Sequence, residues 1–227
     1  MRRVPDSVFR QMAGRLTADA RDEMAIPSYL HPNPLMRWMA WRRVELLARH
    51  LGRMCLQHGS ISSSSPMILD FGCGTGVMLG EASQHAQRVY ASDLFVDAAK
   101  ILVNAWKLDN VTLVAADDVS RTILESSLDI IIAGEVLEHL DDLNQTLSFF
   151  RNRLQPQGRL LISVPTEGAL YRCGRRMAGF HGHYHVANAA SIHNDILNAG
   201  FKTESLEKTP GPGPFAIYWI VEYSVPQ

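Results

Sequence analysis

The chain has 227 residues, of which 46% are hydrophobic and 20% charged, as is typical of a soluble globular protein with a full core. Its formal net charge of −1 argues against a DNA-binding protein, which usually carries a basic excess. Three cysteines without paired spacing indicate a reducing, cytoplasmic setting. No apolar run is long enough to predict a signal peptide or a membrane span.

Residues 1–60 are expected to form a helical extension before a core domain at residues 61–227. This extension is basic, with ten arginines against five acids. Residues 35–54 show apolar and basic stripes at helical spacing, including Trp38 and Arg42. Two interpretations stay open: a helix laid over the sheet edge or the substrate side, and a surface helix that touches a membrane or an amphiphilic substrate.

From residue 66 the pattern alternates between strands and helices, which predicts an α/β fold with a mostly parallel sheet and helices on both faces. Strands are expected at residues 67–71, 88–92, 111–115, 128–133, 159–164, 202–208 and 216–223. Helices are expected from residue 77, at 95–106, after Asp141 or Asp142, and at 191–199. The last two strands are joined closely enough to be antiparallel, so we predict seven strands with an antiparallel last strand.

A glycine turn follows the first strand, with Gly72, Gly74 and Gly76 at alternate positions. Such a turn lets a ligand lie against bare backbone. Val77 stands where a dinucleotide turn needs glycine, and no Lys-Ser/Thr pair follows, which excludes a P-loop. Acids end four of the strands (Asp70, Asp93, Asp117 and Glu135). A ring of acids favours a cationic ligand over a phosphate.

These motifs resemble the class I methyltransferases that use S-adenosylmethionine (SAM), and most closely the small-molecule O-methyltransferases of the ubiquinone-pathway type. The matching stretches are residues 68–76, Asp93, residues 115–118, 129–140 and 154–165. The resemblance implies SAM as cofactor, held by Asp70, Gly72, Cys73, Gly74, Gly76, Asp93, Leu94, Asp117, Asp118 and Glu135. Several roles stay open. Asp70 could instead hold the turn, Asp93 could cap a helix, and either Asp117 or Asp118 could bind the adenine.

Glu135 and His139 are the catalytic candidates, with His139 as a base for an acceptor hydroxyl. A metal is a further prediction, because Glu135, Glu138, His139 and His183 resemble the Glu-x-x-Glu-His … His site of some O-methyltransferases. The same motif also resembles that of relatives without a metal. A substrate-side insertion is expected at about residues 165–190. Its candidate acceptor-binding residues are Arg172, Arg175, His183 and His185, and a solvated charged face is the alternative.

The sequence therefore predicts a SAM-dependent methyltransferase that acts on a small molecule, at a hydroxyl oxygen. One alternative is an RNA 2′-O-methyltransferase, which the near-neutral charge disfavours. Another is an enzyme that methylates a lipid or glycolipid at a membrane surface, reached through the N-terminal helix. A third is an accessory protein that binds SAM without catalysis.

Overall fold

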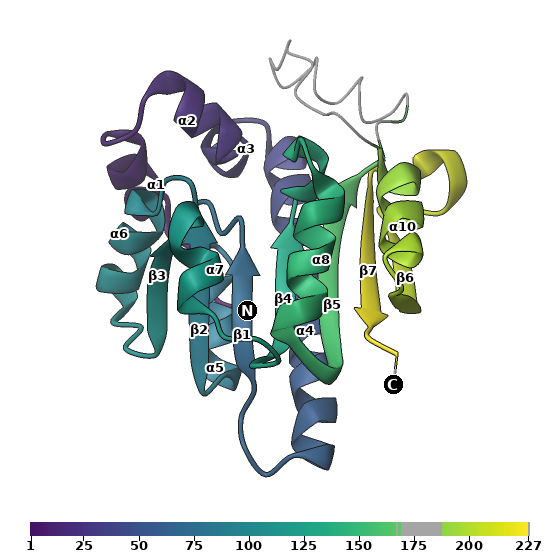
Figure 1. The fold of residues 1–227 in the computed structure, drawn as a ribbon. Coiled ribbons are helices and arrows are strands. Elements are labelled where there is room, and N and C mark those ends of the chain that lie inside the picture. The colour runs from purple at the N-terminus through teal and green to yellow at the C-terminus, as the bar shows by residue number, and fades with distance from the viewer. Residues whose placement is uncertain (167, 169–187, 227) are drawn as a thin grey trace. The chain divides into compact units, whose positions relative to one another are not determined.

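The computed structural model describes residues 1–166, 168 and 188–226 (Figure 1). The chain divides into two compact units, Met1–Thr122 and Ile123–Gln227, and each is described by itself. Among the described residues, no helix is long and apolar enough to cross a membrane.

The first unit contains three parallel strands, β1 (Met67–Phe71), β2 (Arg88–Asp93) and β3 (Val111–Ala115), with β2 between the other two. Buried apolar residues such as Ile68 and Val89 explain why β1 and β2 form inner strands, whereas β3, which is less buried, lies at the edge. Because the strands are parallel, their carboxyl ends meet at one edge. The glycine turn and the acids that follow β1, β2 and β3 therefore gather at that edge of the unit.

Helices account for most of the rest of the first unit. They are α1 (Asp6–Ala13), α2 (Ala18–Glu23), α3 (Ile26–Tyr29), α4 (Pro34–Ile61), α5 (Leu79–His85), α6 (Asp97–Trp106), the short η1 (Ala116–Asp118) and α7 (Val119–Thr122). Helix α1 packs against α6, and α4 packs against α5. Figure 1 shows α2 and α3 at the end of the unit toward which β1 points. The N-terminal helices thus lie on the side of the unit where its strands end.

An aromatic cluster joins the N-terminal helices to α4. The rings of Phe9 and Tyr29 stack with centroids 4.9 Å apart, and Trp41 lies 5.1 Å from Tyr29. The buried Arg43 guanidinium donates a hydrogen bond to the Tyr29 hydroxyl at 2.8 Å. Burial of these large rings stabilises the cluster, because aromatic side chains remove much apolar surface from water. The extension at residues 1–60 is therefore packed as part of the first unit.

The apolar residues of the stripes expected along residues 35–54 differ in exposure. Leu35 and Trp38 are exposed, at 56% and 45%, whereas Leu46 is buried at 1%. Leu46 therefore lies on the face of α4 that packs inward. Exposed apolar side chains stand near both ends of the helix, since Leu56 and Ile61 near its end are exposed as well. A contact of this helix with a membrane or a substrate stays a prediction.

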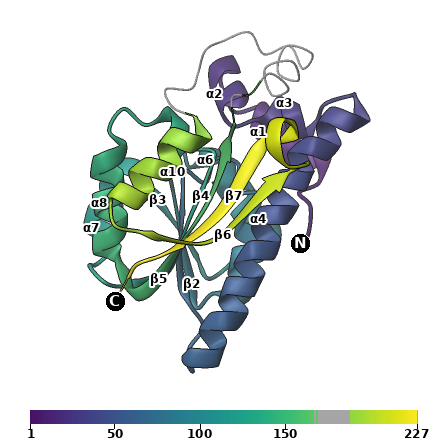
Figure 2. The same cartoon turned by 90° about the vertical axis from the view of Figure 1, so that its right-hand side faces the viewer.

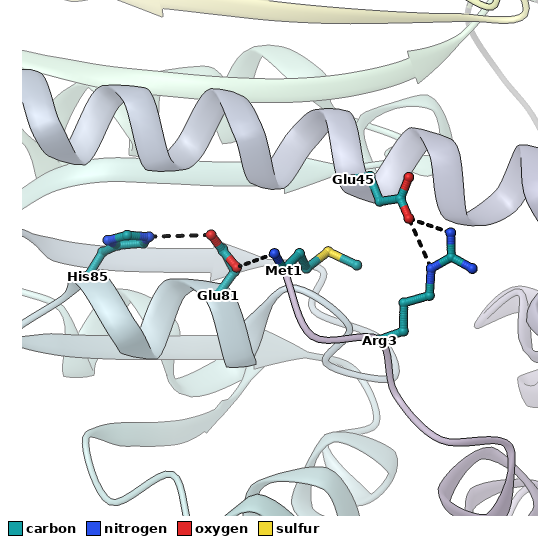
Figure 3. Close-up of polar contacts among 5 residues, drawn as sticks. All are labelled: Met1, Arg3, Glu45, Glu81 and His85. Carbon is teal, nitrogen blue, oxygen red and sulfur yellow. Dashed lines mark hydrogen bonds and ion pairs between the residues drawn. The ribbon is translucent and has the colours of Figure 1, made fainter.

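Polar contacts fix the first residues of the chain to α4 and α5 (Figure 3). Arg3 Nε donates to Glu45 Oε1 at 2.9 Å, the Met1 amino group lies 3.5 Å from Glu81 Oε2, and His85 Nε2 lies 3.3 Å from Glu81 Oε1. Glu81 thus contacts two basic groups from different segments. Each such pair contributes little alone, but together they hold the N-terminal segment in place.

The second unit contains β4 (Leu128–Gly134), β5 (Leu154–Pro165), β6 (Lys202–Thr209) and β7 (Tyr218–Ser224). Strands β4 and β5 are parallel, and β7 lies antiparallel between β5 and β6. Its helices are η2 (Leu137–His139), α8 (Leu143–Arg153), α10 (Ala189–Asn198) and η3 (Gly213–Phe215). Figure 2 shows α8 and α10 on one face of these strands.

The seven strands follow the order β3-β2-β1-β4-β5-β7-β6. The predicted α/β class, with a mostly parallel sheet and an antiparallel last strand, is confirmed. The Asp142 carboxylate caps α8 by accepting the Gln145 N–H at 2.9 Å, and Gly200, with φ 87°, follows α10. Both helix boundaries agree with the side-chain rules from which they were predicted.

Several boundaries differ from the prediction, including the starts of α5, α6, β5, α10 and β7. Helix α5 begins at Leu79 rather than at residue 77, because the glycine turn extends further than expected. Helix α6 begins at Asp97 rather than Phe95, because the Asp93 carboxylate accepts the Phe95 N–H and holds a turn there. Strand β5 begins at Leu154, five residues early, with an irregular register against β4.

The chain is anchored on both sides of the predicted insertion. Thr166 donates its backbone N–H to the Ile217 carbonyl at 2.9 Å and its hydroxyl to the Ala216 carbonyl at 2.8 Å. Asn188 caps α10 through a reciprocal pair of hydrogen bonds with Ser191. The positions at which the insertion leaves and rejoins the second unit are therefore fixed by local bonds.

Candidate functional site

The glycine turn is held against the end of β2 by backbone hydrogen bonds. The N–H groups of Gly72 and Cys73 both donate to the Ser92 carbonyl, at 2.8 and 3.0 Å, and the Gly76 N–H donates to the Cys73 carbonyl at 2.7 Å. All three glycines have left-handed backbone angles, with φ of 71°, 52° and 77°. Glycine adopts this region without steric cost, which explains its use at these positions.

Gly74 and Gly76 meet different surroundings. A Cβ atom at Gly76 would lie 2.8 Å from Leu79 Cδ1, so this glycine allows the turn to pack against the start of α5. A Cβ atom at Gly74 would meet nothing within 4 Å. Packing therefore explains Gly76, whereas Gly74 leaves open space beside the turn. That space is where a ligand can approach the backbone.

Asp93 links the turn to the segment after β2. Its Oδ2 accepts the Gly74 N–H at 2.8 Å, and its Oδ1 accepts the Phe95 N–H at 3.1 Å. The alternative that Asp93 caps a helix is wrong, because the residue at the cap position of α6 is Val96. Each carboxylate oxygen retains a second lone pair that can accept a ribose hydroxyl. Leu94, which follows, is 76% exposed and available to contact a ligand.

The structure distinguishes the two acids after β3. Asp118 forms an ion pair with Arg121, one turn along the chain. Asp117 is exposed, and no described residue forms a hydrogen bond or ion pair with it. A free carboxylate is the better acceptor for an amine such as that of adenine. Of the two residues predicted to bind the adenine, we therefore favour Asp117.

Asp70 differs from these acids in being buried, with only 4% exposure at the end of β1. Burial, and secondly the charge of Asp93, raises the pKa of the Asp70 carboxyl to about 7. Burial and the charges of Asp70 and Asp93 also raise the pKa of the Cys73 thiol well above its ordinary value. Cys73 is therefore a neutral small side chain in the turn and not a nucleophile.

The second unit carries the other predicted catalytic residues, just after β4. Glu135 has φ 56°, which is uncommon for a residue other than glycine, and its N–H donates to the Ser163 carbonyl at 2.8 Å. A left-handed conformation costs free energy in a residue other than glycine, and Ala25, Lys107, Ser126 and Gln157 share it outside the candidate site. The sequence pattern indicated Glu135 as an acid at a strand end, but it did not predict the left-handed backbone conformation of this residue.

Glu138 and His139 follow on η2 and differ in exposure, since Glu138 is 1% exposed and His139 lies at the surface. Across the described ranges, no three His, Cys, Asp or Glu side chains form a group that could hold a metal ion. Glu135, Glu138 and His139 thus do not fit a metal centre on their own. The fourth predicted ligand, His183, lies outside the described residues, as do Arg172, Arg175 and His185.

Comparison with known proteins identifies the fold and its family. Residues 39–206 match the family model described as methyltransferase domain. The chain belongs to the methyltransferase domain family. Its seven strands have the order of the class I SAM-dependent methyltransferases. The turn with open space at Gly74, the Asp93 carboxylate and the free Asp117 are thus the candidate SAM-binding residues of a methyltransferase domain.

Curated relatives of this methyltransferase domain include two O-methyltransferases. A malonyl-[acyl-carrier protein] O-methyltransferase from Yersinia pestis is 31% identical over 145 residues, covering 62% of this chain and 51% of that protein. The mitochondrial ubiquinone biosynthesis O-methyltransferase of Schizosaccharomyces pombe is 29% identical over 117 residues, covering 48% of this chain and 41% of that protein. The chain thus spans about half the length of these relatives.

Solved structures share the fold over nearly the whole chain. The N-methyltransferase NodS from Bradyrhizobium japonicum, in complex with S-adenosylhomocysteine (SAH), has a TM-score of 0.64 and 19% identity, covering 97% of this chain and 99% of that chain. The 1,6-didemethyltoxoflavin-N1-methyltransferase from Burkholderia thailandensis has a TM-score of 0.63 and 18% identity, covering 100% and 93%. At these identities the likeness shows the fold alone.

Proposed function

We propose that this chain transfers the methyl group of SAM to an oxygen atom of a small-molecule acceptor. The proposal that the chain binds SAM rests on the open space at Gly74. This glycine lies in a turn that is hydrogen-bonded to the Asp93 carboxylate. Relatives named as O-methyltransferases support oxygen as the acceptor atom. The two similar structures named as N-methyltransferases make nitrogen the competing acceptor.

Three residues of the first unit would hold the donor. Asp93 accepts the ribose hydroxyls, Asp117 accepts the adenine amine, and the turn at Gly74 lets the chain of the donor lie against backbone. Bound there, SAM supplies a methyl group on a positively charged sulfur. The acids of this edge favour that positive charge over an anionic ligand.

His139 of the second unit is the proposed general base. His139 lies at the surface, and histidine is the side chain most often used as a general base. In its neutral form the imidazole takes the proton of the acceptor hydroxyl as the oxygen forms its bond to the methyl carbon. The described residues Glu135, Glu138 and His139 do not form a metal site by themselves, and the proposed proton transfer involves the imidazole of His139.

A deuterium-labelled assay tests the proposal. The protein is incubated with a cell extract and SAM that carries a trideuterated methyl group, and mass spectrometry finds the metabolites that gain the label. We expect a labelled small molecule whose fragmentation places the label on oxygen. Label on nitrogen or carbon would overturn the acceptor atom, and label found only on RNA or lipid would overturn the small-molecule class.

Variants and a chelator then test the residues. Asp117→Asn should weaken SAM binding severalfold to tenfold, because a hydrogen bond to a charged carboxylate becomes one to a neutral amide oxygen, whereas Asp118→Asn should leave it unchanged. The reverse order would mean that Asp118 binds the adenine.

We expect methyl transfer to persist after treatment with EDTA. Loss of transfer that added Mg²⁺ restores would show that a metal is required and contradict the histidine-only step.

A further inference from the structure

An apolar patch lies at the start of α4 in the first unit. It consists of Pro32, Pro34, Leu35 and Trp38, all of which are exposed. Pro34 and Leu35 precede Trp38 by four and three residues, so the three side chains share one face of the helix. The next helical turn packs inward through Trp41, which is only 2% exposed. The apolar patch is thus separate from the buried aromatic cluster and open to solvent.

Basic side chains of α4 accompany the apolar patch. Between Glu23 and Glu45 the chain has three arginines and no acidic residue. Arg42 lies one turn after Trp38 on the same face of the helix and is partly exposed. No described residue forms a hydrogen bond or an ion pair with Arg42. The face that carries the apolar patch therefore also carries a cation that is available to an anionic partner.

Helix α1 adds a further cation near this surface. Asp6, the first residue of α1, forms an ion pair with Arg37, which precedes Trp38. Arg10 follows Asp6 by one turn of α1 and is exposed, and among the described residues none pairs with it. Around the apolar patch, α1 and α4 thus contribute Arg10, Arg37 and Arg42 against the single acid Asp6. The surface has an excess of positive charge.

The other end of α4 has exposed apolar side chains but lacks these charges. Leu56 and Ile61 are exposed at 76% and 75%, whereas residues 54–61 include no Arg, Lys, Asp or Glu. Contact with a lipid surface uses apolar side chains that enter the headgroup boundary and cations that attract anionic headgroups. The two ends of the helix match in apolar exposure and differ in charge, so only the start combines both components.

We propose that the apolar patch, with Arg10, Arg37 and Arg42, docks this protein on an anionic lipid surface. A stable protein–protein interface takes about 20–30 residues on each side, many more than this patch supplies. A lipid surface instead gains attraction from each inserted apolar side chain and each nearby cation. Trp38 and Leu35 enter the headgroup boundary, while the arginines stay at the level of the phosphates.

Docking at this place has a consequence for the candidate SAM site. The apolar patch follows α3 directly in the chain, and Figure 1 shows α3 at the end of the first unit toward which β1 points. The glycine turn and Asp93 follow strands that end at the same edge. A lipid surface held by the patch would therefore face the end of the unit where SAM is proposed to bind. The docking itself does not depend on SAM.

Sedimentation of the full chain with vesicles tests the proposal. One set of vesicles contains phosphatidylcholine alone, and the other contains equal parts of phosphatidylcholine and phosphatidylglycerol. We expect the protein to pellet with the anionic vesicles and to stay in solution with the neutral ones. Binding should weaken severalfold as ionic strength rises from about 0.01 to 0.15 M, because the Debye length shortens from about 30 to 8 Å. No binding, or equal binding to both sets, would overturn the proposal.

Two double variants on one helix identify the surface that binds. Leu35→Ser with Trp38→Ser should weaken vesicle binding tenfold or more, since both apolar contacts are lost. Leu56→Ser with Ile61→Ser removes as many exposed apolar side chains from the other end and should bind like the wild type. Arg42→Gln should weaken binding about fivefold. Equal losses in the two double variants would overturn the assignment to the start of α4.

Trp38 also gives a signal in a protein that keeps its apolar patch. The tryptophan emission of the wild type should shift to shorter wavelength on anionic vesicles, and in Trp38→Phe this shift should be absent although binding persists. An unchanged shift in Trp38→Phe would show that Trp38 does not meet the lipid. If the protein stays in solution with anionic vesicles and Leu35→Ser with Trp38→Ser turns a dimer into a monomer, the patch is a contact between copies and the lipid proposal is overturned. Calorimetry with SAM tests the proposed function separately.

Discussion

The two units build their candidate sites from different parts of the chain. In the first unit the site is mainly backbone, since the glycine turn is fixed by the Ser92 carbonyl and by the Asp93 carboxylate. In the second unit it is mainly side chains, with Glu135 and His139 after β4 and further candidates outside the described residues. A backbone site requires particular residue types at fixed spacing. It therefore leaves a sequence signature that a site made of side chains on loops does not.

The largest expected effect is on turnover, and it distinguishes the methyl-transfer step from SAM binding. His139→Ala should lower turnover by about 10² to 10⁴, the usual contribution of a general base, and leave SAM affinity unchanged. Turnover is measured by methyl transfer to the acceptor, and affinity by calorimetry. Partial recovery with added imidazole would support the role. If turnover falls less than threefold, His139 is not the base.

The pH dependence of stability tests the buried acid of the first unit. The pKa of Asp70 is higher in the folded protein, at about 7, than its ordinary value of 3.8, so the folded state binds the proton more tightly than the unfolded state. Its contribution to the free energy of unfolding is full below pH 4 and is lost as pH rises to 7. The slope is at most about 1.4 kcal/mol per pH unit.

Urea denaturation of the ligand-free protein from pH 4.5 to 8 measures this slope. Asp70→Asn should lose it, so the difference in unfolding free energy between the two proteins should change up to pH 7 and stay constant above. A difference that is constant over the whole range would mean that Asp70 is ionised when the protein folds.

Removing the acid that joins the turn to the next segment should have a smaller effect. Asp93→Ala should weaken SAM binding by about 1–3 kcal/mol, because hydrogen bonds to a charged group are lost from both the ribose and the Gly74 N–H. Calorimetry measures this change, with Asp109→Asn as the control. Unchanged affinity would show that the ribose is bound elsewhere.

The last prediction compares two glycines of one turn. Both Gly74→Ala and Gly76→Ala put a side chain in the left-handed region, which costs about 1–2 kcal/mol of stability. Gly76→Ala should cost about 1–3 kcal/mol more, because its Cβ would collide with Leu79. Gly74→Ala should instead weaken SAM binding by filling the open space. Denaturation of each variant measures its stability, and calorimetry measures its affinity for SAM. Together they show whether the loss of stability and the loss of SAM affinity are separate effects.

The sequence predicted the features that depend on local residue patterns. The bounds of β1 and β3 agree with the apolar runs that defined them, and Asp142 caps α8 as its position suggested. Other features depend on contacts between distant residues. The burial of Leu46, the early start of β5 and the left-handed conformation of Glu135 arise from packing and register, which residue types alone do not specify.

The anchors at Thr166 and Asn188 have a consequence for engineering. Thr166 is hydrogen-bonded to Ala216 and Ile217, before β7, and its hydroxyl oxygen also accepts the Gly168 N–H at 3.4 Å. Asn188 is hydrogen-bonded to Ser191 in the first turn of α10. A segment exchanged between these two positions would leave both attachment points intact. Grafting the corresponding segment of a relative between these two positions would test the prediction that the segment at about residues 165–190 binds the acceptor, with methyl transfer to that relative's acceptor as the measurement.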